Sequence, residues 1–392
     1  MRKIILYLAV VCASITSNFA QNYNWSMYIQ QDYPTGIIYD SNDTMWYIVQ
    51  GTGLFEKTGS SAIDHSSGLV TTNIVGISNN GSNIWVSGYG GVSMFDGSNF
   101  TNYDQSTYFN EYGILGIASK NEVWATQETY GASKYNGSTW THYTNADGIM
   151  GLYFPALTIN QTGNVFLVAS DYNNGNKGYV NVFNGTNWTY YDSSSAMIVV
   201  NPLSVFCDSN NDIWVGGDNA LMKFDGVNWV TIATRPEDNI EIISITEDSY
   251  GNIWFAEKNG GGVYCYNGST VIDAGSPENF SGKSQGITAD NNGSVYVCLN
   301  SGVYKVDIIT SVKKLKSNDV KIYPNPITDK ININIANQDL RSVNIKLYNI
   351  SGEIIMSDNY SNLNNIIIST ENLEEGIYFL SINNLVEKIV KY

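Results

Sequence analysis

The residue types that usually carry catalysis are scarce in this chain. It has two histidines, His65 and His142, and neither stands at a spacing from Ser, Cys or Asp that is typical of a nucleophilic triad. No phosphate-binding glycine loop is present, and the separation of an acidic pair acting on a glycosidic bond is a distance in space that a sequence does not give. The residues favour a binding protein over an enzyme. The alternative is a polysaccharide-degrading lyase or glycosidase, with His65 as the histidine placed to serve a lyase.

Calcium is the one metal for which the sequence offers a pattern. Asp208-Ser209-Asn210-Asn211-Asp212 carries oxygen ligands at alternate positions, but it lacks the sixth-position Gly and twelfth-position Glu of a calcium loop. Similar stretches at Asp248 and Asp290 recur at the same place in neighbouring repeats. A repeated hairpin turn explains this recurrence better than a metal site, so we predict no metal and no cofactor.

Tyrosines beside carboxylates are the candidate ligand-binding residues. They fall in segments that differ from one repeat to the next, such as "SGYGG", "QETYG", "STYFNEYG" and "DGIMGLYFP". Exposed rings suit stacking against sugars, carboxylates accept hydrogen bonds from hydroxyl groups, and variable loops on a rigid scaffold commonly carry recognition. The alternative is that these side chains pad the rim of the fold or fill its centre. The candidates are Tyr89, Tyr108, Tyr112, Glu128, Tyr130, Tyr153, Phe154, Asp171, Tyr172 and Glu257.

These loops belong to a repeat of roughly 40 residues. Each repeat has four short apolar or alternating runs separated by turn residues, as in "EIISITED", "IWFAE", "GGVYCY" and "STVIDA". Because both faces of such a sheet are apolar, neighbouring sheets must cover them, and stacking around a ring does so. We therefore predict an all-β fold with a seven-bladed β-propeller at residues 21–307. Each of the seven repeats has an aromatic residue at the same position of its second run, and we call these positions the marker column: Trp46, Trp85, Trp124, Phe166, Trp214, Trp254 and Tyr296.

The turn between the third and fourth runs has the sharpest local pattern. An aromatic residue precedes Asp-Gly or Asn-Gly in five repeats, as in Phe95-Asp96-Gly97 and Tyr135-Asn136-Gly137. These pairs accept positive φ at both central positions, so we predict type I′ hairpin turns.

The ring needs a closing strand. The seventh repeat ends after its third run at Asp307, whereas the segment "NYNWSMYIQ" from Asn22 reads as a fourth run without a repeat of its own. We predict that it pairs with the seventh sheet and covers an otherwise open strand edge. Trp25 should then take the position of Trp140 in its own sheet, and Tyr28 that of Tyr143.

The repeats resemble those of two-component-regulator propellers. The matching stretches are "DSNNDIWVGGDNALMKF" from Asp208 and "EDSYGNIWFAEKNGGGVYCY" from Glu247. The resemblance implies a propeller that recognises a ligand, often as the extracellular sensor part of a kinase. This sequence shows no kinase, the apolar run within residues 1–20 is too short to span a bilayer, and no other apolar stretch approaches that length. We therefore expect neither signalling nor a transmembrane segment.

The last part of the chain has another composition. Residues 308–319 read as a polar linker, and residues 320–392 as alternating strands of a small β-sandwich. Pro324 and Pro326 should mark a strand start or a free edge, and hairpin turns are expected at Ser351-Gly352 and around Asn383-Asn384.

This part resembles the type A C-terminal sorting domain of the type IX secretion system. The resemblance implies that the type IX secretion machinery is a partner, and that the protein passes through the periplasm and is secreted or attached to the outer cell surface. The matching residues are Tyr323, Pro324, Asn325, Pro326, Gly352, Gly376, Tyr378, Lys388 and Lys391.

The start of the chain and its charge agree with export. Residues 1–20 combine a basic start, an apolar run and a small, polar close, as a signal peptide does. The chain has 20 basic and 36 acidic residues and a net charge of −16, which argues against nucleic acid as a partner. Three cysteines after residues 1–20 stand in apolar runs and are expected to be small buried side chains: Cys207, Cys265 and Cys298. The sequence leaves open whether two of them form a disulfide.

Overall fold

The structure is a computed structural model that describes residues 23–59, 61–218, 220–234, 241–258, 262–277, 283–308, 320–335, 343–360, 365–382 and 385–392. The chain divides into two compact units, residues 1–308 and 309–392, which we describe separately. The predicted signal peptide and all but the first residue of the predicted linker lie outside the described residues.

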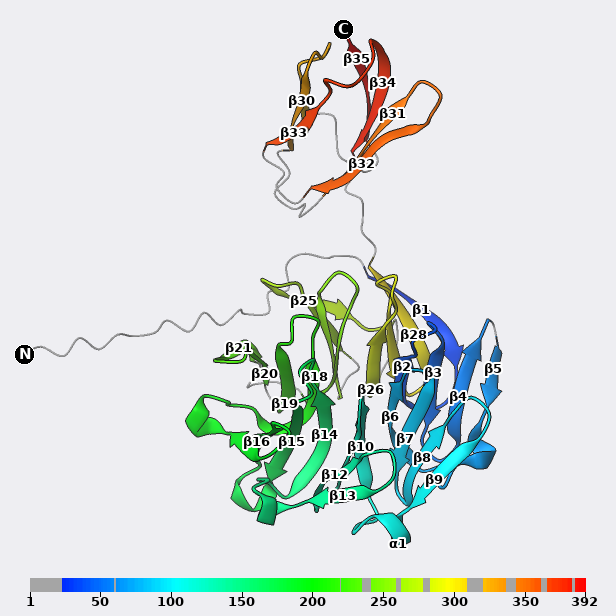
Figure 1. Ribbon diagram of the computed structural model, residues 1–392, viewed down its shortest axis with the longest axis vertical. Helices are drawn as coiled ribbons and strands as arrows, with labels where there is room; N and C mark the ends of the chain where they lie inside the picture. Colours follow the sequence, from blue (N-terminus) through cyan, green and yellow to red (C-terminus); the bar gives the residue numbers. More distant parts are fainter. Residues whose placement is uncertain are drawn as a thin grey trace, which may run out of the picture. The chain divides into compact units, whose positions relative to one another are not determined.

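Four-stranded antiparallel sheets make up the first unit (Figure 1). Six of them use four consecutive strands in chain order. They are β2–β5 (Pro34–Tyr39, Met45–Val49, Gly53–Thr58, Ser61–Asp64), β6–β9 (Ile74–Asn80, Asn83–Gly88, Gly91–Phe95, Phe100–Asp104), β10–β13 (Ile114–Ser119, Val123–Gln127, Gly131–Tyr135, Trp140–Tyr143), β14–β17 (Tyr153–Ile159, Val165–Asp171, Lys177–Phe183, Trp188–Tyr191), β18–β21 (Val200–Cys207, Ile213–Asp218, Ala220–Phe224, Trp229–Thr234) and β22–β25 (Ile242–Glu247, Ile253–Glu257, Val263–Tyr266, Val271–Gly275).

A further sheet joins the two ends of this unit. Its strands are β26 (Ser284–Ala289), β27 (Val295–Leu299), β28 (Gly302–Ile308) and, on the outside, β1 (Tyr23–Gln30). The first strand of each sheet contacts the first strand of the next, from β2 through β6, β10, β14, β18 and β22 to β26, and β26 contacts β2. The sheets are therefore arranged in a closed circle, and Figure 1 shows fourth strands such as β5, β9 and β21 toward its outside.

The hydrophobic cores lie between neighbouring sheets. In one of them, Trp46 and Leu54 of the β2–β5 sheet pack against Ile84, Val86 and Phe95 of the β6–β9 sheet. Since every sheet contributes one face to each of two such cores, both of its apolar faces are covered.

The predicted closing strand is confirmed. β1 pairs antiparallel with β28, from Tyr23 opposite Ile308 to Gln30 opposite Gly302. The Trp25 indole donates a hydrogen bond to the Ala274 carbonyl at 2.9 Å, and the Tyr23 ring meets the Trp254 ring edge-on at 5.6 Å. The strand is therefore fixed to its own sheet and to the preceding one.

The prediction for Tyr28 is wrong. A β-bulge between Met27 and Ile29 shifts the register by one residue, so that Ile29 lies opposite Val303 and is buried. Because side chains alternate along a strand, this extra residue leaves Tyr28 outside the core, where it is exposed and its ring contacts that of Tyr296.

The predicted type I′ turns are also wrong, although the hairpins are present. Gly97 has a φ of 94°, whereas Asp96 does not adopt a positive φ. Instead, the Asp96 carboxylate accepts hydrogen bonds from the backbone N–H groups of Ser98 at 2.8 Å and Asn99 at 2.7 Å. The side chain thus forms an Asx turn, and only the Gly takes the left-handed conformation.

The calcium-like spacing is a hairpin turn, as predicted. One oxygen of Asp208 accepts hydrogen bonds from the N–H groups of Asn210 and Asp212, and the other accepts the indole N–H of Trp214 at 2.8 Å. Asp40 and Asp248 hold Trp46 and Trp254 in the same way, six residues further along. The carboxylate oxygens are therefore occupied by protein donors.

Cys265 and Cys298 are buried, whereas Cys207 is half-buried. No disulfide joins these three described cysteines.

The second unit contains two antiparallel sheets. One has the order β29 (Val320–Tyr323), β30 (Lys330–Ile335), β33 (Ile366–Ser369), and the other β32 (Ile354–Tyr360), β31 (Val343–Asn349), β34 (Gly376–Ile382), β35 (Leu385–Lys391). They share one core, to which Ile331 and Ile368 contribute from the first sheet and Leu347 and Leu380 from the second. Gly352 has a φ of 82° in the predicted β31–β32 turn, and the turn expected at Asn383-Asn384 lies outside the described residues.

Replacing Trp25 by Ala should lower the free energy of unfolding by about 2–4 kcal/mol, because a half-buried indole and its hydrogen bond are lost. Met27→Ala, on the same strand but exposed, should change it by less than about 1 kcal/mol. Urea denaturation followed by fluorescence measures both. Equal stability of the Trp25 variant and the parent would mean that β1 does not hold the ring closed.

Candidate functional site

The two ends of the strands in the first unit carry different connections. Turns between the first and second strands of each sheet lie at one end, and these turns are tied to one another. Gln161 donates to the Ser209 carbonyl at 2.8 Å, the Ser209 N–H donates to Glu247 at 2.7 Å, and Asn291 donates to Asp43 at 3.1 Å, each across neighbouring sheets. Their polar groups are thus used to hold sheets together.

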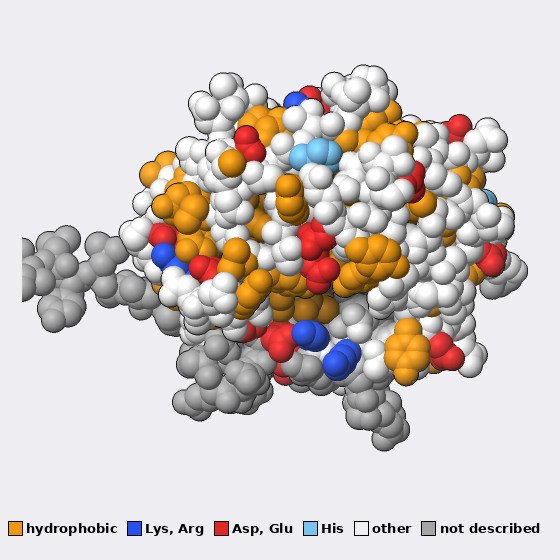
Figure 2. Space-filling model, turned by 90° about the horizontal axis from the view of Figure 1, so that it is seen from below, with side chains coloured by type: hydrophobic (Ala, Val, Ile, Leu, Met, Phe, Trp, Pro, Cys, Tyr) orange, Lys and Arg blue, Asp and Glu red, His pale blue; other side chains and the backbone are white. Residues whose placement is uncertain are grey.

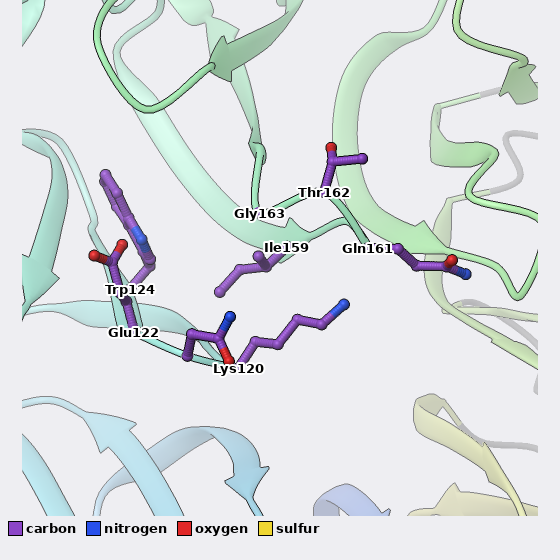
Figure 3. A pocket seen from close by; sticks show the side chains of 8 residues that line it. Lys120, Glu122, Trp124, Ile159, Gln161, Thr162 and Gly163 are labelled. Atoms are coloured by element: carbon purple, nitrogen blue, oxygen red, sulfur yellow. The ribbon is translucent and has the colours of Figure 1, made fainter.

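A cavity of about 270 Å³ lies at this end, between the turns that follow β10 and β14 (Figure 3). Its charged groups already have partners, because Lys120 donates to the Asn160 carbonyl at 3.2 Å and Glu122 pairs with Lys134 at 2.7 Å. None of the predicted site residues is among its lining residues, of which only Trp124 was singled out from the sequence, as a repeat position. The lining residues are Lys120, Asn121, Glu122, Trp124, Ile159, Gln161, Thr162 and Gly163.

The opposite end carries the variable loops, and there the structure brings predicted residues together. The Gly90 N–H donates to the Tyr112 carbonyl, the Glu128 N–H to the Gly113 carbonyl, and the Phe154 N–H to the Glu128 carbonyl, at 2.8–3.0 Å. These backbone bonds bring loops of three consecutive sheets side by side. The Tyr89 and Tyr112 rings are 5.9 Å apart.

We call Tyr89, Glu111, Tyr112, Glu128 and Tyr153 the tyrosine–glutamate cluster. Burial, and then the nearby Glu111, raise the pKa of the Glu128 carboxyl. Burial followed by Glu128 raises the pKa of Tyr89, and burial followed by Tyr89 and Glu128 raises that of Tyr153. Glu111, Tyr89 and Tyr153 therefore each lie within electrostatic reach of Glu128.

Figure 2 shows the face that carries α1 (Gln105–Tyr108), seen from below. Acidic and hydrophobic side chains stand next to one another around its hollowed middle. Glu111 also accepts hydrogen bonds from the Thr129 N–H, at 2.6 Å, and from its hydroxyl, which fixes one loop to the next. The arrangement offers rings for stacking and carboxylate oxygens for hydrogen bonds.

The remaining predicted residues are not brought into this cluster by any described contact. Tyr108 and Tyr130 are exposed on neighbouring loops, and the Tyr108 ring contacts that of Tyr103. Asp171 ends β15 and Tyr172 follows it on the loop of the β14–β17 sheet, where Asp171 accepts from the Asn173 N–H. Glu257 ends β23 and accepts a hydrogen bond from the Tyr264 hydroxyl at 3.3 Å.

The prediction of Phe154 as an exposed ring is wrong. Phe154 is fully buried in the core that also contains Trp124 and Leu167. It follows Tyr153 at the start of β14, and alternation along the strand turns the two side chains to different environments.

Neither histidine belongs to the cluster. His65 contacts Glu56 at 3.0 Å and packs against Trp46 and Phe95. His142 lies on β13 and contacts the Ser133 hydroxyl at 2.8 Å. No described contact therefore joins a histidine to the tyrosine–glutamate cluster, as the lyase alternative would require there.

In the second unit the two ends of the sorting motif meet. The Asn325 side chain donates to the Lys388 carbonyl at 2.8 Å and accepts from the Val390 N–H at 3.0 Å. The Ile327 N–H donates to the Val390 carbonyl, and the Lys391 ammonium donates to the Thr328 carbonyl. The segment after β29 thus holds the last strand, β35, in place. Pro324 and Pro326 lie in this connection rather than in a strand.

Comparison with known proteins gives matches for both units of the chain. Residues 321–392 match the family model of the secretion system C-terminal sorting domain. This match confirms the predicted sorting domain and indicates secretion to the cell surface. No curated protein matches the sequence.

Solved structures show the fold of the first unit. A streptogramin B lyase structure is similar with a TM-score of 0.62 and 16% identity, over 73% of this chain and 97% of that one. The extracellular domains of two putative hybrid two-component systems of B. thetaiotaomicron, BT4673 and BT3049, have TM-scores of 0.59 and 0.60 and identities of 15% and 14%. They match 92% and 96% of this chain, which spans 57% and 58% of their length. The first unit therefore has a β-propeller-like fold, similar to the folds of these structures.

Among the described residues, no helix is both long and apolar enough to span a membrane, and no cluster of His, Cys, Asp or Glu is suited to a metal ion.

Replacing Asn325 by Ala should reduce the surface-exposed or secreted fraction of the protein and increase its periplasmic fraction. Loss of both Asn325 bonds should destabilise the second unit by about 1–3 kcal/mol. Lys321→Ala, at an exposed position of β29, is the matched control. Immunoblots of fractionated cells measure the distribution, and normal export of the Asn325 variant would show that this anchor is not needed for sorting.

Proposed function

We propose that the chain is an exported recognition protein, built as a seven-bladed β-propeller at residues 21–307 and a β-sandwich sorting domain at residues 320–392. Support for seven blades comes from the seven four-stranded sheets described in the first unit and from the contact of β26 with β2. Support for the sandwich comes from the core shared by the two sheets of the second unit. A signal peptide at residues 1–20 completes the export route through the periplasm.

The ligand in this proposal is a glycan, bound at the end of the propeller that carries the variable loops. The tyrosine–glutamate cluster is the observation that supports it most. Tyr112 is exposed beside Tyr89, and Glu128 contributes, after burial, to the raised pKa values of Tyr89 and Tyr153. A sugar ring presents an apolar face that stacks on aromatic rings and hydroxyl groups that donate to carboxylates. A protein ligand is the alternative occupant of the same face.

One observation keeps a polysaccharide-degrading enzyme as the second candidate. Burial and Glu111 raise the pKa of Glu128, and a carboxyl group with a raised pKa beside a second carboxylate is the arrangement that glycosidases use. No described contact gives this pair a histidine partner.

A glycan array, followed by titration calorimetry and turnover assays on the oligosaccharides that bind, separates these functions. Tyr112→Ala and Glu128→Gln should each weaken binding about tenfold or more, equivalent to about 1.4 kcal/mol. Tyr172→Ala removes an equally exposed ring from another sheet and should change affinity less than about twofold. Formation of a new reducing or unsaturated end would favour the enzyme. Absence of glycan binding, or equal affinity in all variants, would contradict the proposal.

A further inference from the structure

A buried polar side chain lies directly beneath the loop that carries Tyr112. Gln127, the last residue of β11, is fully buried. Its Oε1 accepts the backbone N–H of Asn110 at 2.8 Å, and its Nε2 donates to the Ser133 hydroxyl oxygen at 3.0 Å. Ser133, also fully buried, contacts His142 Nδ1 at 2.8 Å. A chain of three hydrogen bonds thus leads from a loop to a titratable residue.

The directions of the first two bonds in this chain are fixed by its first member. A backbone N–H can only donate, so Gln127 Oε1 must face Asn110 and Nε2 must face Ser133. Ser133 accepts from Nε2, and the other polar atom described in contact with its hydroxyl is His142 Nδ1, at 2.8 Å. We infer that the serine proton is donated to this nitrogen, because a buried hydroxyl proton needs an acceptor. In this arrangement the neutral imidazole of His142 carries its proton on Nε2, which is the tautomer that the test below measures.

The loop held by Gln127 is part of the proposed ligand-binding face. Asn110 is followed by Glu111 and Tyr112, two members of the tyrosine–glutamate cluster. Glu111 fixes the loop to Thr129, and the Tyr112 carbonyl accepts the Gly90 N–H. Glu111 is itself ionisable and lies on the loop, whereas the Gln127 bond leads to an ionisable group on another strand, His142 on β13.

We propose that Gln127 is a positioning residue for the loop that carries Glu111 and Tyr112, and that protonation of His142 is transmitted to this loop through Ser133 and Gln127. The effect on ligand affinity rests on the glycan-binding function proposed above. The hydrogen-bond chain and its response to a proton do not.

Protonation reverses the last bond of the chain. A charged imidazole has N–H groups on both nitrogens, so Nδ1 then donates to Ser133 and the serine proton must turn away. In a fully buried site a hydroxyl proton without an acceptor is unfavourable, and so is a displaced Gln127 amide. The bond from Gln127 to Asn110 is weakened as a result.

Burial is what sets the protonation of His142. It lowers the pKa of the imidazole, and no charged neighbour contributes. The titratable groups on the adjoining strands are Lys134 and Tyr135 on β12 and Tyr143 on β13, with Tyr108 next to Phe109, whose ring lies 6.2 Å from the imidazole. Lys134 is paired with Glu122 and stands over the Trp124 ring.

The sign of the pH dependence follows. Because burial lowers the pKa of His142, its imidazole takes up a proton at a lower pH than an exposed histidine does, and the effect begins there. Because the folded state resists protonation there while the unfolded state accepts it, stability and loop order decrease together with falling pH.

The test is NMR of the full chain labelled with ¹⁵N-histidine and ¹⁵N-asparagine. The chain has two histidines, so His65→Gln assigns their signals and serves as the control outside the hydrogen-bond chain. We expect the Nε2–H tautomer of His142 at pH 7.5, and an Asn110 amide shift that follows the His142 titration between pH 7.5 and 5. An Nδ1–H tautomer, or an Asn110 signal indifferent to this titration, would overturn the proposal.

Two variants separate transmission from simple loss of structure. Ser133→Ala removes the link, so that the Asn110 amide should no longer follow His142. His142→Asn keeps an acceptor for Ser133 but cannot be protonated, so it should retain the Asn110 shift seen at pH 7.5 throughout the range. A pH response that persists in both variants contradicts the proposal.

Ligand binding provides the second readout. If an oligosaccharide binds, its affinity should fall at least about threefold from pH 7.5 to 5 in the parent and stay constant in His142→Asn. Equal pH dependence in both would remove His142 from regulation. If no glycan binds, the glycan-binding function fails, while the tautomer and the Asn110 shift still decide the proposal.

Discussion

Every sheet of the first unit has two apolar faces, and this constraint governs the rest of its structure. If the sheets were stacked in an open row, the first and the last sheet would each leave one apolar face exposed to water. In a closed circle each face is buried against a neighbour, as Trp46 and Leu54 are against Ile84 and Phe95. Closure also requires a fourth strand for the last sheet, and the chain provides it from its other end as β1. Ring closure and hydrophobic burial are therefore one requirement.

The two ends of the strands are used differently within this ring. At the end with the short turns, Asp side chains accept hydrogen bonds from turn N–H groups and from the indoles of the marker tryptophans. Further hydrogen bonds join the turns of neighbouring sheets. At the other end, loops of unequal length meet around the tyrosine–glutamate cluster, where Glu128 and Tyr153 are half-buried without being part of a core. We expect ligand recognition where side chains are held in position but are neither buried in a core nor used to join neighbouring sheets.

Much of this fold could be predicted from the sequence because it repeats. The tryptophan column and the Asp-Gly and Asn-Gly turns mark four strands in each unit, and the unpaired "NYNWSMYIQ" indicates the closing strand. Single-residue features could not be predicted in this way. The bulge that moves Tyr28 outward is one added residue, and the turn at Asp96 depends on a side chain that competes with the backbone. The Asp–Trp spacing of six residues was present in the sequence and could have predicted the indole bonds.

The candidate site was predicted only in outline. Loop variability located Tyr89, Tyr112, Glu128 and Tyr153, but it also included Phe154, whose place is in the core between two sheets. Asn325 was recognised as part of a motif, whereas its bonds to Lys388 and Val390 depend on contacts 63 and 65 residues apart. Gln127 begins the variable segment "QETYG" but was not chosen from it, since a buried glutamine at a strand end is identified only by what surrounds it.

Hydrogen–deuterium exchange of the full chain, with and without a bound oligosaccharide, tests most directly where the ligand lies. Slower exchange confined to residues 108–113, 128–130 and 150–154 is the predicted result. Slower exchange at the turns 120–123 and 160–164, with the loops unchanged, would place the ligand at the opposite end of the strands and contradict the account.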